Sequence, residues 1–156
     1  MTVRLSTGMR DKLLNGGASG GLKNALNLGF IAIYSAPQPL TGDSAATGTL
    51  LGTESVGGAS TGLTFGNSAS GTIAKTPAED WKFVGLADGT AGWWRFYPAA
   101  GNPALASTTE ARIDGSVASS GGDLNISNIA VKTGVPNTVD VFQFTMPDRK
   151  STRLNS

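Results

Sequence analysis

The spacing of apolar residues changes from helical intervals to alternation near residue 29. Over residues 1–28 the apolar positions recur at helical intervals, in two short runs separated by the Gly-rich stretch of residues 16–21. Ser6 or Thr7 can cap the first helix, and Asn15 followed by a glycine marks its end. Isolated helices shorter than about 12–15 residues are only marginally stable. We therefore expect this segment to pack against another surface.

From residue 30 onward apolar and polar positions alternate, which is typical of half-buried strands. The predicted strands cover residues 30–35, 49–56, 63–65, 72–75, 81–86, 91–97, 112–117, 124–131 and 139–146. Short strands bounded by Gly, Asn, Asp or Pro at such even spacing favour an antiparallel sheet structure. We predict one mainly β domain, an antiparallel β-sandwich or jelly roll over residues 29–147, with a short N-terminal helical segment over residues 1–28.

Alternation also predicts which side chains share a face. In residues 91–97, Trp93, Arg95 and Tyr97 should face one way, and Trp94 and Phe96 the other. The last predicted strand should place three side chains on one face, Phe142, Phe144 and Met146, and two on the opposite face, Val139 and Val141.

Composition narrows the possible chemistry. Only 15 % of the residues are charged, and the chain contains neither Cys nor His. Disulfides, thiolate chemistry, the usual general base near neutral pH and most transition-metal ligands are therefore excluded. We expect a protein that is not an enzyme and that binds no cofactor or metal.

The final residues change the charge balance. Residues 148–156, DRKSTRLNS, resemble a translated sequencing-library adapter, so we exclude them from fold reasoning. Without their three basic residues and one acidic residue, the net charge changes from +1 to −1. Because the basic balance then disappears, we expect no nucleic-acid partner.

No part of the sequence predicts a membrane partner. The charged residues Arg10, Asp11 and Lys12 interrupt the region where a secretory signal would need an apolar run. The longest apolar run, residues 28–34, is interrupted by a glycine and is far shorter than the roughly 20 residues that span a bilayer. We expect a soluble protein that is used without export.

Two patterns suggest catalysis but lack the groups that would complete it. Residues 58–62 match the G-x-S-x-G motif of a hydrolase, yet Ser60 has no imidazole base and the flanking pattern is not strand then helix. Five carboxylates could in principle form the pair that glycoside hydrolysis requires: Glu54, Glu79, Asp80, Glu110 and Asp114. Their spacing singles out no pair, so we interpret them as charges on solvent-facing positions.

The tryptophans offer a binding alternative. Exposed indole rings suit stacking against sugars, so Trp81, Trp93 and Trp94 could form a glycan platform. Alternation sends Trp93 and Trp94 to opposite faces, so we expect at least one of them in the core. A host-glycan-binding module is therefore kept as an alternative function.

The order of landmarks along the chain carries a family resemblance. RLSTGMRDKLL is followed by FIAIYSAPQP, TGTLLGT, SGTIAK, TAGWWRFY and RIDGSVASSGGDLNIS, and a closing strand ends at Pro147. In this order the chain resembles a family of small tailed-bacteriophage and prophage proteins, usually described only as hypothetical or virion structural proteins. The resemblance covers nearly all of residues 4–147. It implies a non-catalytic virion protein, assembled in the cytoplasm of the bacterial host, with no catalytic residues to transfer.

We therefore expect a capsid decoration or cement protein, with a tail or neck component as the alternative. The expected partners are other virion proteins, the major capsid protein or tail and neck proteins, and the subunit should be a homo-oligomer or bound to a lattice. The candidate subunit contacts are Leu5, Met9, Leu13, Leu14, Leu22 and Leu26. Two interpretations of residues 1–28 stay open: an arm that exchanges with neighbouring subunits, or a helical lid over one end of the sandwich.

Overall fold

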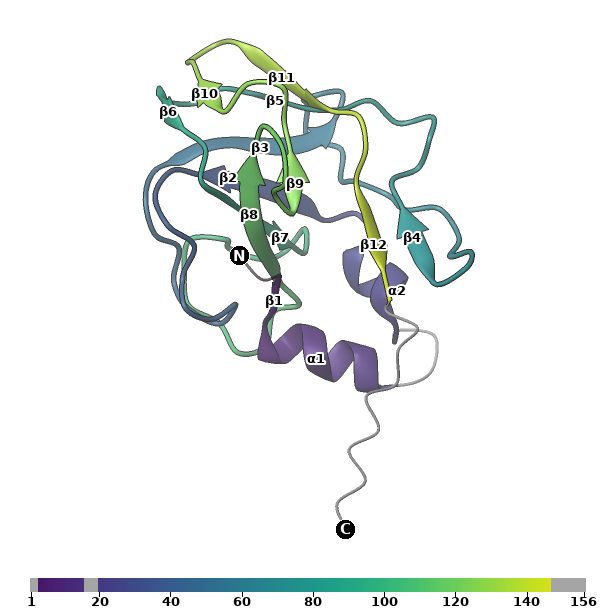
Figure 1. Cartoon of the computed structure of the whole chain (residues 1–156). Helices are drawn as coiled ribbons and strands as arrows, with labels where there is room; N and C mark the ends of the chain where they lie inside the picture. Colours follow the sequence, from purple (N-terminus) through teal and green to yellow (C-terminus); the bar gives the residue numbers. More distant parts are fainter. Residues whose placement is uncertain (1–2, 16–19, 147–156) are drawn as a thin grey trace.

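The computed structural model describes residues 3–15 and 20–146, and within them the chain is mainly β (Figure 1). Two short helices lie near the N-terminus, α1 (Thr7–Leu14) and α2 (Leu22–Leu26). The strands are β1 (Arg4–Leu5), β2 (Phe30–Tyr34), β3 (Leu50–Val56), β4 (Thr72–Ala74), β5 (Trp81–Val84), β6 (Gly89–Thr90), β7 (Trp93–Tyr97), β8 (Ile113–Ala118), β9 (Leu124–Asn125), β10 (Ala130–Val131), β11 (Pro136–Val139) and β12 (Gln143–Thr145). The predicted mainly β fold with short N-terminal helices is confirmed.

One large sheet organises the molecule. Its strand order is β1-β8-β7-β2-β3-β5-β11, and β9 joins the side of β8. Every pair along this order is antiparallel, and the β8–β9 pair is parallel. Two small antiparallel sheets, β10-β6 and β12-β4, lie beside it. This arrangement is consistent with the predicted β-sandwich.

The main core lies on one face of the large sheet. Its centre is aromatic: the ring of Phe142 contacts Trp81 at 5.6 Å between centroids and Trp94 at 5.3 Å, and Phe65 meets Trp81 edge-on at 5.3 Å. The helices and the β12-β4 sheet contribute to the same core through Met9, Leu26 and Ile73 among others, so they cover this face of the sheet.

The second face of the large sheet is covered by two loops. Tyr34 stacks on Trp93 with 4.6 Å between ring centroids, and the Trp93 indole N–H donates to the Thr47 carbonyl at 3.1 Å. The loop of residues 98–111 lies over the same face, because Arg95 Nη1 donates to the Pro103 carbonyl at 2.9 Å. Trp93 and Trp94 therefore face opposite ways, as alternation predicted.

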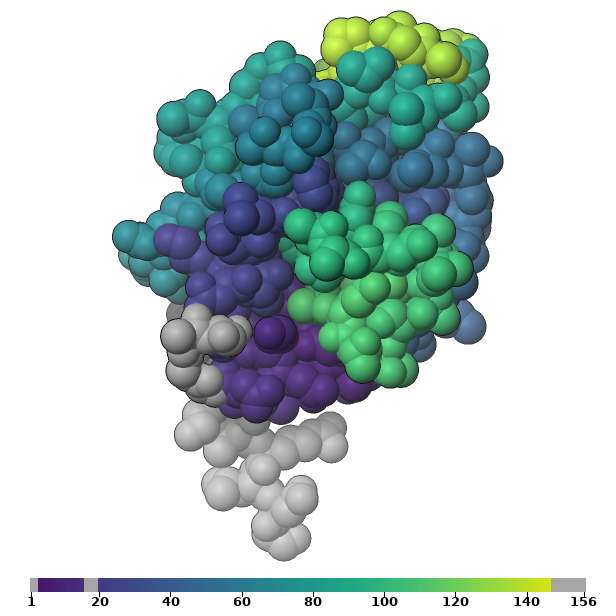
Figure 2. Space-filling model, turned by 180° about the vertical axis from the view of Figure 1, so that it is seen from behind, coloured from purple at the N-terminus to yellow at the C-terminus, as the bar shows by residue number. Residues whose placement is uncertain are grey.

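The N-terminal segment is built into the body of the domain. Ser6 caps α1 by accepting a hydrogen bond from the Met9 N–H at 3.0 Å, and it also accepts one from the Arg112 N–H at 2.9 Å. Gly8 lies directly on the backbone of the loop before β8, where a Cβ atom would stand 2.3 Å from the Thr109 carbonyl oxygen. Figure 2 shows the N-terminal residues (purple) against the green loop. This packing favours the lid interpretation over the exchanging arm.

Three predicted strands differ from the observed ones. Residues 63–65 form only isolated bridges, Gly29 with Leu63 and Phe65 with Lys75. The predicted strand at 124–131 divides into β9 and β10. The predicted strand at 139–146 divides as well, because the chain leaves β11 after Val139 and crosses to β4 as β12.

This crossing changes the expected faces of the last strand. Val139 is buried within β11, and Phe142 reaches the main core, whereas Met146 is 59 % exposed. Phe144 is half-buried and packs against the core from its edge. The predicted adapter-like tail, residues 148–156, lies outside the described residues.

Candidate subunit-contact site

The six predicted contact residues fall into three environments. Met9 and Leu26 are completely buried in the chain's own core and expose no surface to a partner in this structure, so a subunit contact at these two residues stays a prediction. Leu13 and Leu22 are half-buried and pack against the core. Leu5 is 37 % exposed and Leu14 is 84 % exposed. The structure therefore leaves part of the set available at the surface and uses the rest for folding.

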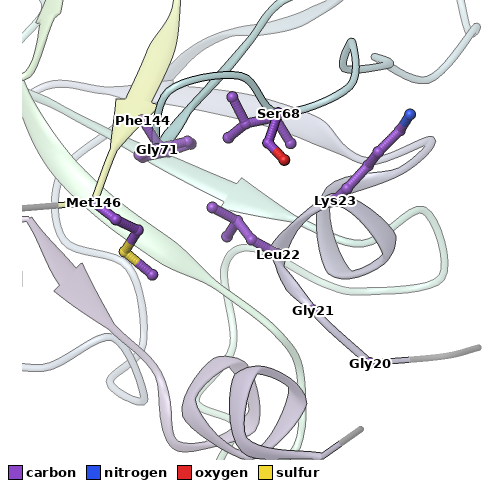
Figure 3. A pocket seen from close by; sticks show the side chains of 9 residues that line it. Gly20, Gly21, Leu22, Lys23, Ser68, Gly71, Phe144 and Met146 are labelled. Atoms are coloured by element: carbon purple, nitrogen blue, oxygen red, sulfur yellow. The ribbon is translucent and has the colours of Figure 1, made fainter. Parts of the chain in front are cut away.

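Leu22 lines a mainly apolar hollow on the described surface (Figure 3). The hollow has a volume of about 350 Å³ and lies between α2 and the β12-β4 sheet. Leu22, Ile73, Phe144 and Met146 give it an apolar lining. In Figure 3 the Leu22 and Met146 side chains lie on facing sides of this space. It can accept an apolar side chain from a partner.

Local chain geometry explains how the hollow forms. Phe144 stands directly opposite Ile73 in the antiparallel β12-β4 pair, so these side chains share a face. The tight turn before β4 places Ser70 and Gly71 at positive φ, 50° and 74°. The Met146 N–H donates to the Gly71 carbonyl at 2.9 Å, which holds the end of β12 over this turn.

The rim of the hollow carries one charged side chain among its lining residues. Lys23 donates from Nζ to Asn67 Oδ1 at 2.7 Å across the gap between α2 and the segment before β4. Ser68 adds a hydroxyl on the same side. The lining therefore combines apolar walls with a polar edge, an arrangement typical of protein contact surfaces.

The predicted G-x-S-x-G motif forms a turn after β3 and not a nucleophile elbow. Gly57 and Gly58 adopt positive φ, 70° and 71°, and the chain turns back so that Thr61 bridges to Val56. Ser60 lies exposed in this turn. Because an elbow requires a strand followed by a helix, the structural interpretation of Ser60 is the one that the geometry supports.

Most of the candidate carboxylates are engaged with separate partners. Asp114 accepts two hydrogen bonds from Arg95, and Glu110 accepts from Arg112 Nε at 2.9 Å. Asp80 pairs with Lys82 at the surface. Partial burial acts to raise the pKa of Glu79, but hydrogen bonds from Thr64 and Trp81 outweigh it and lower that pKa.

Glu54 differs from the other four carboxylates. Its side chain is completely buried, and neither carboxyl oxygen has a hydrogen-bond partner among the described residues. The expectation that this residue is a solvent-facing charge is wrong. It is wrong for Asp114 too, since the Asp114 side chain has no exposed surface.

The tryptophans do not form a sugar platform. Trp81 and Trp93 are 0 % exposed and Trp94 is 1 % exposed. A ring that stacks on a ligand must present a face to solvent, so the glycan-platform prediction is wrong for these three residues.

No protein-family model matches the chain, and neither does any curated protein or solved structure. Within residues 3–15 and 20–146, no group of three or more metal-ligating side chains is placed to hold an ion. In the same described ranges, no helix is long and apolar enough to cross a membrane.

Sequence reasoning found Leu22 but missed its neighbours in the hollow. Alternation predicted that Phe144 and Met146 share one face of a strand, and both side chains line the hollow. This shared face was the one sequence signal that could have indicated the site. Their pairing with β4 joins segments about 70 residues apart, for example Phe144 with Ile73. A pattern within one short segment carries no information about such a partner.

Proposed function

We propose that this chain is a non-enzymatic structural subunit of a tailed-bacteriophage particle, and most specifically a decoration or cement protein on the outside of the head. The observation that carries the proposal is the apolar hollow between α2 and the β12-β4 sheet, with Met146 59 % exposed at its edge. The resemblance in the order of sequence landmarks gives the class of partner.

The rest of the described surface agrees with a role in binding. Burying an exposed Leu or Met side chain contributes about 1.5–3 kcal/mol relative to leaving it in water. Leu14 and Leu40 are two such side chains that stay exposed. A subunit that docks on a lattice has a use for apolar surface that a free monomer would leave in water.

A tail or neck component is the second candidate, because the same hollow would serve it equally well. The two differ in the number of copies that a particle holds, since a cement protein covers a lattice and a neck ring does not. The glycan-binding alternative has lost its supporting observation, because the three tryptophans are buried.

The test is an add-back assay on particles made from a genome that lacks this gene. Purified protein is mixed with such particles, and the bound fraction is measured after sedimentation. Met146→Asp places a charge at the edge of the hollow, and Leu105→Asp is the matched control, because Leu105 is similarly exposed at 61 % and lies on the loop before β8.

We expect the wild-type protein and Leu105→Asp to bind and Met146→Asp to lose at least tenfold in affinity, which corresponds to about 1.4 kcal/mol. Loss of binding in the control alone would move the contact to the loop. Failure of the wild-type protein to bind would contradict the proposed function.

A further inference from the structure

Glu54 occupies an unusual place for a carboxyl group. It lies in the middle of β3 and stands directly opposite Ile31 of β2, in the interior of the large sheet. Its side chain has no exposed surface, and both carboxyl oxygens lack a hydrogen-bond partner among the described residues. Buried polar groups are nearly always hydrogen-bonded, so this exception needs an explanation.

The face on which Glu54 lies is the apolar one. Residues two apart on a strand share a face, and at Gly52 a Cβ atom would stand 2.1 Å from the ring of the buried Phe83. Val56, on the same face, stands opposite the buried Trp81. The carboxyl group is therefore surrounded by side chains that cannot solvate a charge.

The neighbouring elements supply little compensating charge. Glu54 is the only charged residue of β3, and β2 has none. The titratable group of β2, Tyr34, lies on the other face, and so does Lys82 of β5, which stands opposite Ser55. Two groups from the segment before β5 act on Glu54: Lys75 attracts the ionised form and Asp80 repels it.

Lys75 is itself engaged elsewhere. Its Nζ donates to the Glu79 backbone carbonyl and lies 5.8 Å from the centre of the Trp81 ring. Burial is the largest influence, and it raises the pKa of Glu54 to about 8. The acid is therefore neutral in this structure at neutral pH.

The segment of residues 61–80 closes the same region of the core. It places Leu63 and Phe65 among the buried residues, and it carries both Lys75 and Asp80. Glu79 holds the segment together by accepting hydrogen bonds from Thr64 and from the Trp81 indole. Isolated bridges join this segment to the large sheet, Leu63 with Gly29 and Thr61 with Val56, and its strand β4 pairs with β12 of a small sheet. The segment is therefore less firmly held than a strand paired along its length within the large sheet.

We propose that Glu54 is a proton-operated latch that keeps residues 61–80 closed on the large sheet. With its proton bound, the carboxyl group is neutral and tolerates the apolar core. When the proton passes to solvent base, the remaining negative charge has no hydrogen-bond partner, and the molecule relieves it by opening this segment so that water can reach the carboxylate. This inference does not rest on the proposed docking function, although Ser68, Gly71 and Ile73 of this segment also line the hollow.

The direction of the pH effect follows from linkage. An unfolded chain releases the Glu54 proton near pH 4.5, whereas the folded chain keeps it until about pH 8. The stabilising contribution is therefore complete below pH 4.5 and is lost as pH rises through that window. The unfolding equilibrium constant should rise about tenfold per pH unit within the window from this group alone. Glu54→Gln removes the titratable carboxyl group, so this contribution to the pH dependence of unfolding should disappear.

The direct test uses the small number of glutamates. The chain has three, Glu54, Glu79 and Glu110, so labelling the glutamate side-chain carboxyl carbon with ¹³C gives a simple NMR spectrum. We expect one resonance to titrate with a midpoint near 8 and to be absent in Glu54→Gln. A wild-type protein in which all three resonances titrate below pH 6 would overturn the proposal.

Amide hydrogen exchange tests the latch itself, and a Lys75→Met variant adds a test that does not depend on the folding of Glu54→Gln. At pH 9 we expect Leu63 and Lys75 amides to exchange at least tenfold faster in wild type than in Glu54→Gln, with Ile31 and Ile33 unchanged. Lys75→Met should move the wild-type Glu54 midpoint upward, because it removes the attracting charge. A midpoint that does not rise, or equal exchange at Leu63 and Lys75 in wild type and Glu54→Gln, would overturn the latch.

Discussion

The two faces of the large sheet bury charge in opposite ways. On the loop-covered face, Arg95 and Asp114 are both completely buried and form two hydrogen bonds, at 2.8 Å and 2.7 Å. On the main-core face, Glu54 is equally buried and has no partner among the described residues. A buried charge is stable only when its neighbours compensate it, so the first face can keep ions and the second keeps a neutral acid.

On the loop-covered face, buried arginine side chains also donate hydrogen bonds to backbone carbonyl groups. Arg95 donates to the Pro103 carbonyl, and Arg112 donates to the carbonyls of Leu105 and Asn102. The loop of residues 98–111 is therefore fixed by arginine side chains. The main-core face is closed instead by apolar packing from the helices and from the β12-β4 sheet.

The largest expected effect comes from removing part of the apolar cover. A chain that begins at Gly29 lacks Met9 and Leu26, both completely buried, and also lacks β1. We expect it to lose its cooperative thermal transition and to bind a hydrophobic dye, because the main core becomes exposed. A sharp transition in the truncated chain would restore the arm interpretation of residues 1–28.

Breaking the buried ion pair between Arg95 and Asp114 should cause the next largest loss of stability. Asp114→Asn leaves the Arg95 guanidinium buried without its counter-charge, and we expect a loss of about 3–5 kcal/mol in urea unfolding. Glu110→Gln is the control, because the Glu110 side chain is 26 % exposed and water can replace it. For Glu110→Gln we expect the free energy of unfolding to fall by about 1–2 kcal/mol. Equal losses would mean that burial does not govern the strength of these pairs.

Substitutions at the edge of the main-core face should reduce stability less. Phe144 is half-buried between the main core and the hollow, so we expect Phe144→Ala to reduce the free energy of unfolding by about 1–2 kcal/mol. Phe142→Ala, at 4 % exposure, should cost at least twice as much. Urea unfolding of the two variants checks this ratio. Equal losses would mean that Phe144 belongs to the core as fully as Phe142 does.

The smallest effect is expected at Leu14. Its side chain is 84 % exposed at the end of α1, so Leu14→Ser should change the free energy of unfolding by less than about 0.5 kcal/mol. Calorimetry of the two proteins checks this value. A larger loss would show that Leu14 contributes to folding and is unavailable for a partner.

Local patterns predicted the parts of the fold that depend on neighbouring residues. The alternation in WWRFY assigned Trp93 and Trp94 to opposite faces, and Ser6 was among the expected caps of α1. Both features are decided within a few positions of sequence. The strand β11 was missed, because Pro136 and Asn137 rarely occur within strands and are accepted here at the sheet edge.

The features of the candidate site and of the latch depend on contacts between distant segments. In the sequence TLLGTESV, Glu54 occupies a position that alternation alone cannot assign to water or to core. Its burial results from the pairing of β3 with β2 and β5 and from the cover of residues 61–80. The hollow likewise requires the pairing of β12 with β4.

Both faces of the large sheet are covered from within the chain, so a contact with another protein falls to the outer surface and the hollow. We propose that this surface binds a lattice of virion proteins. The most direct measurement is the amount of this protein, relative to the major capsid protein, in purified phage particles whose genome carries the gene. For a cement protein we expect an abundance comparable to that of the major capsid protein. Presence in only a few copies would favour the tail or neck alternative, and absence from the particle would contradict the claim.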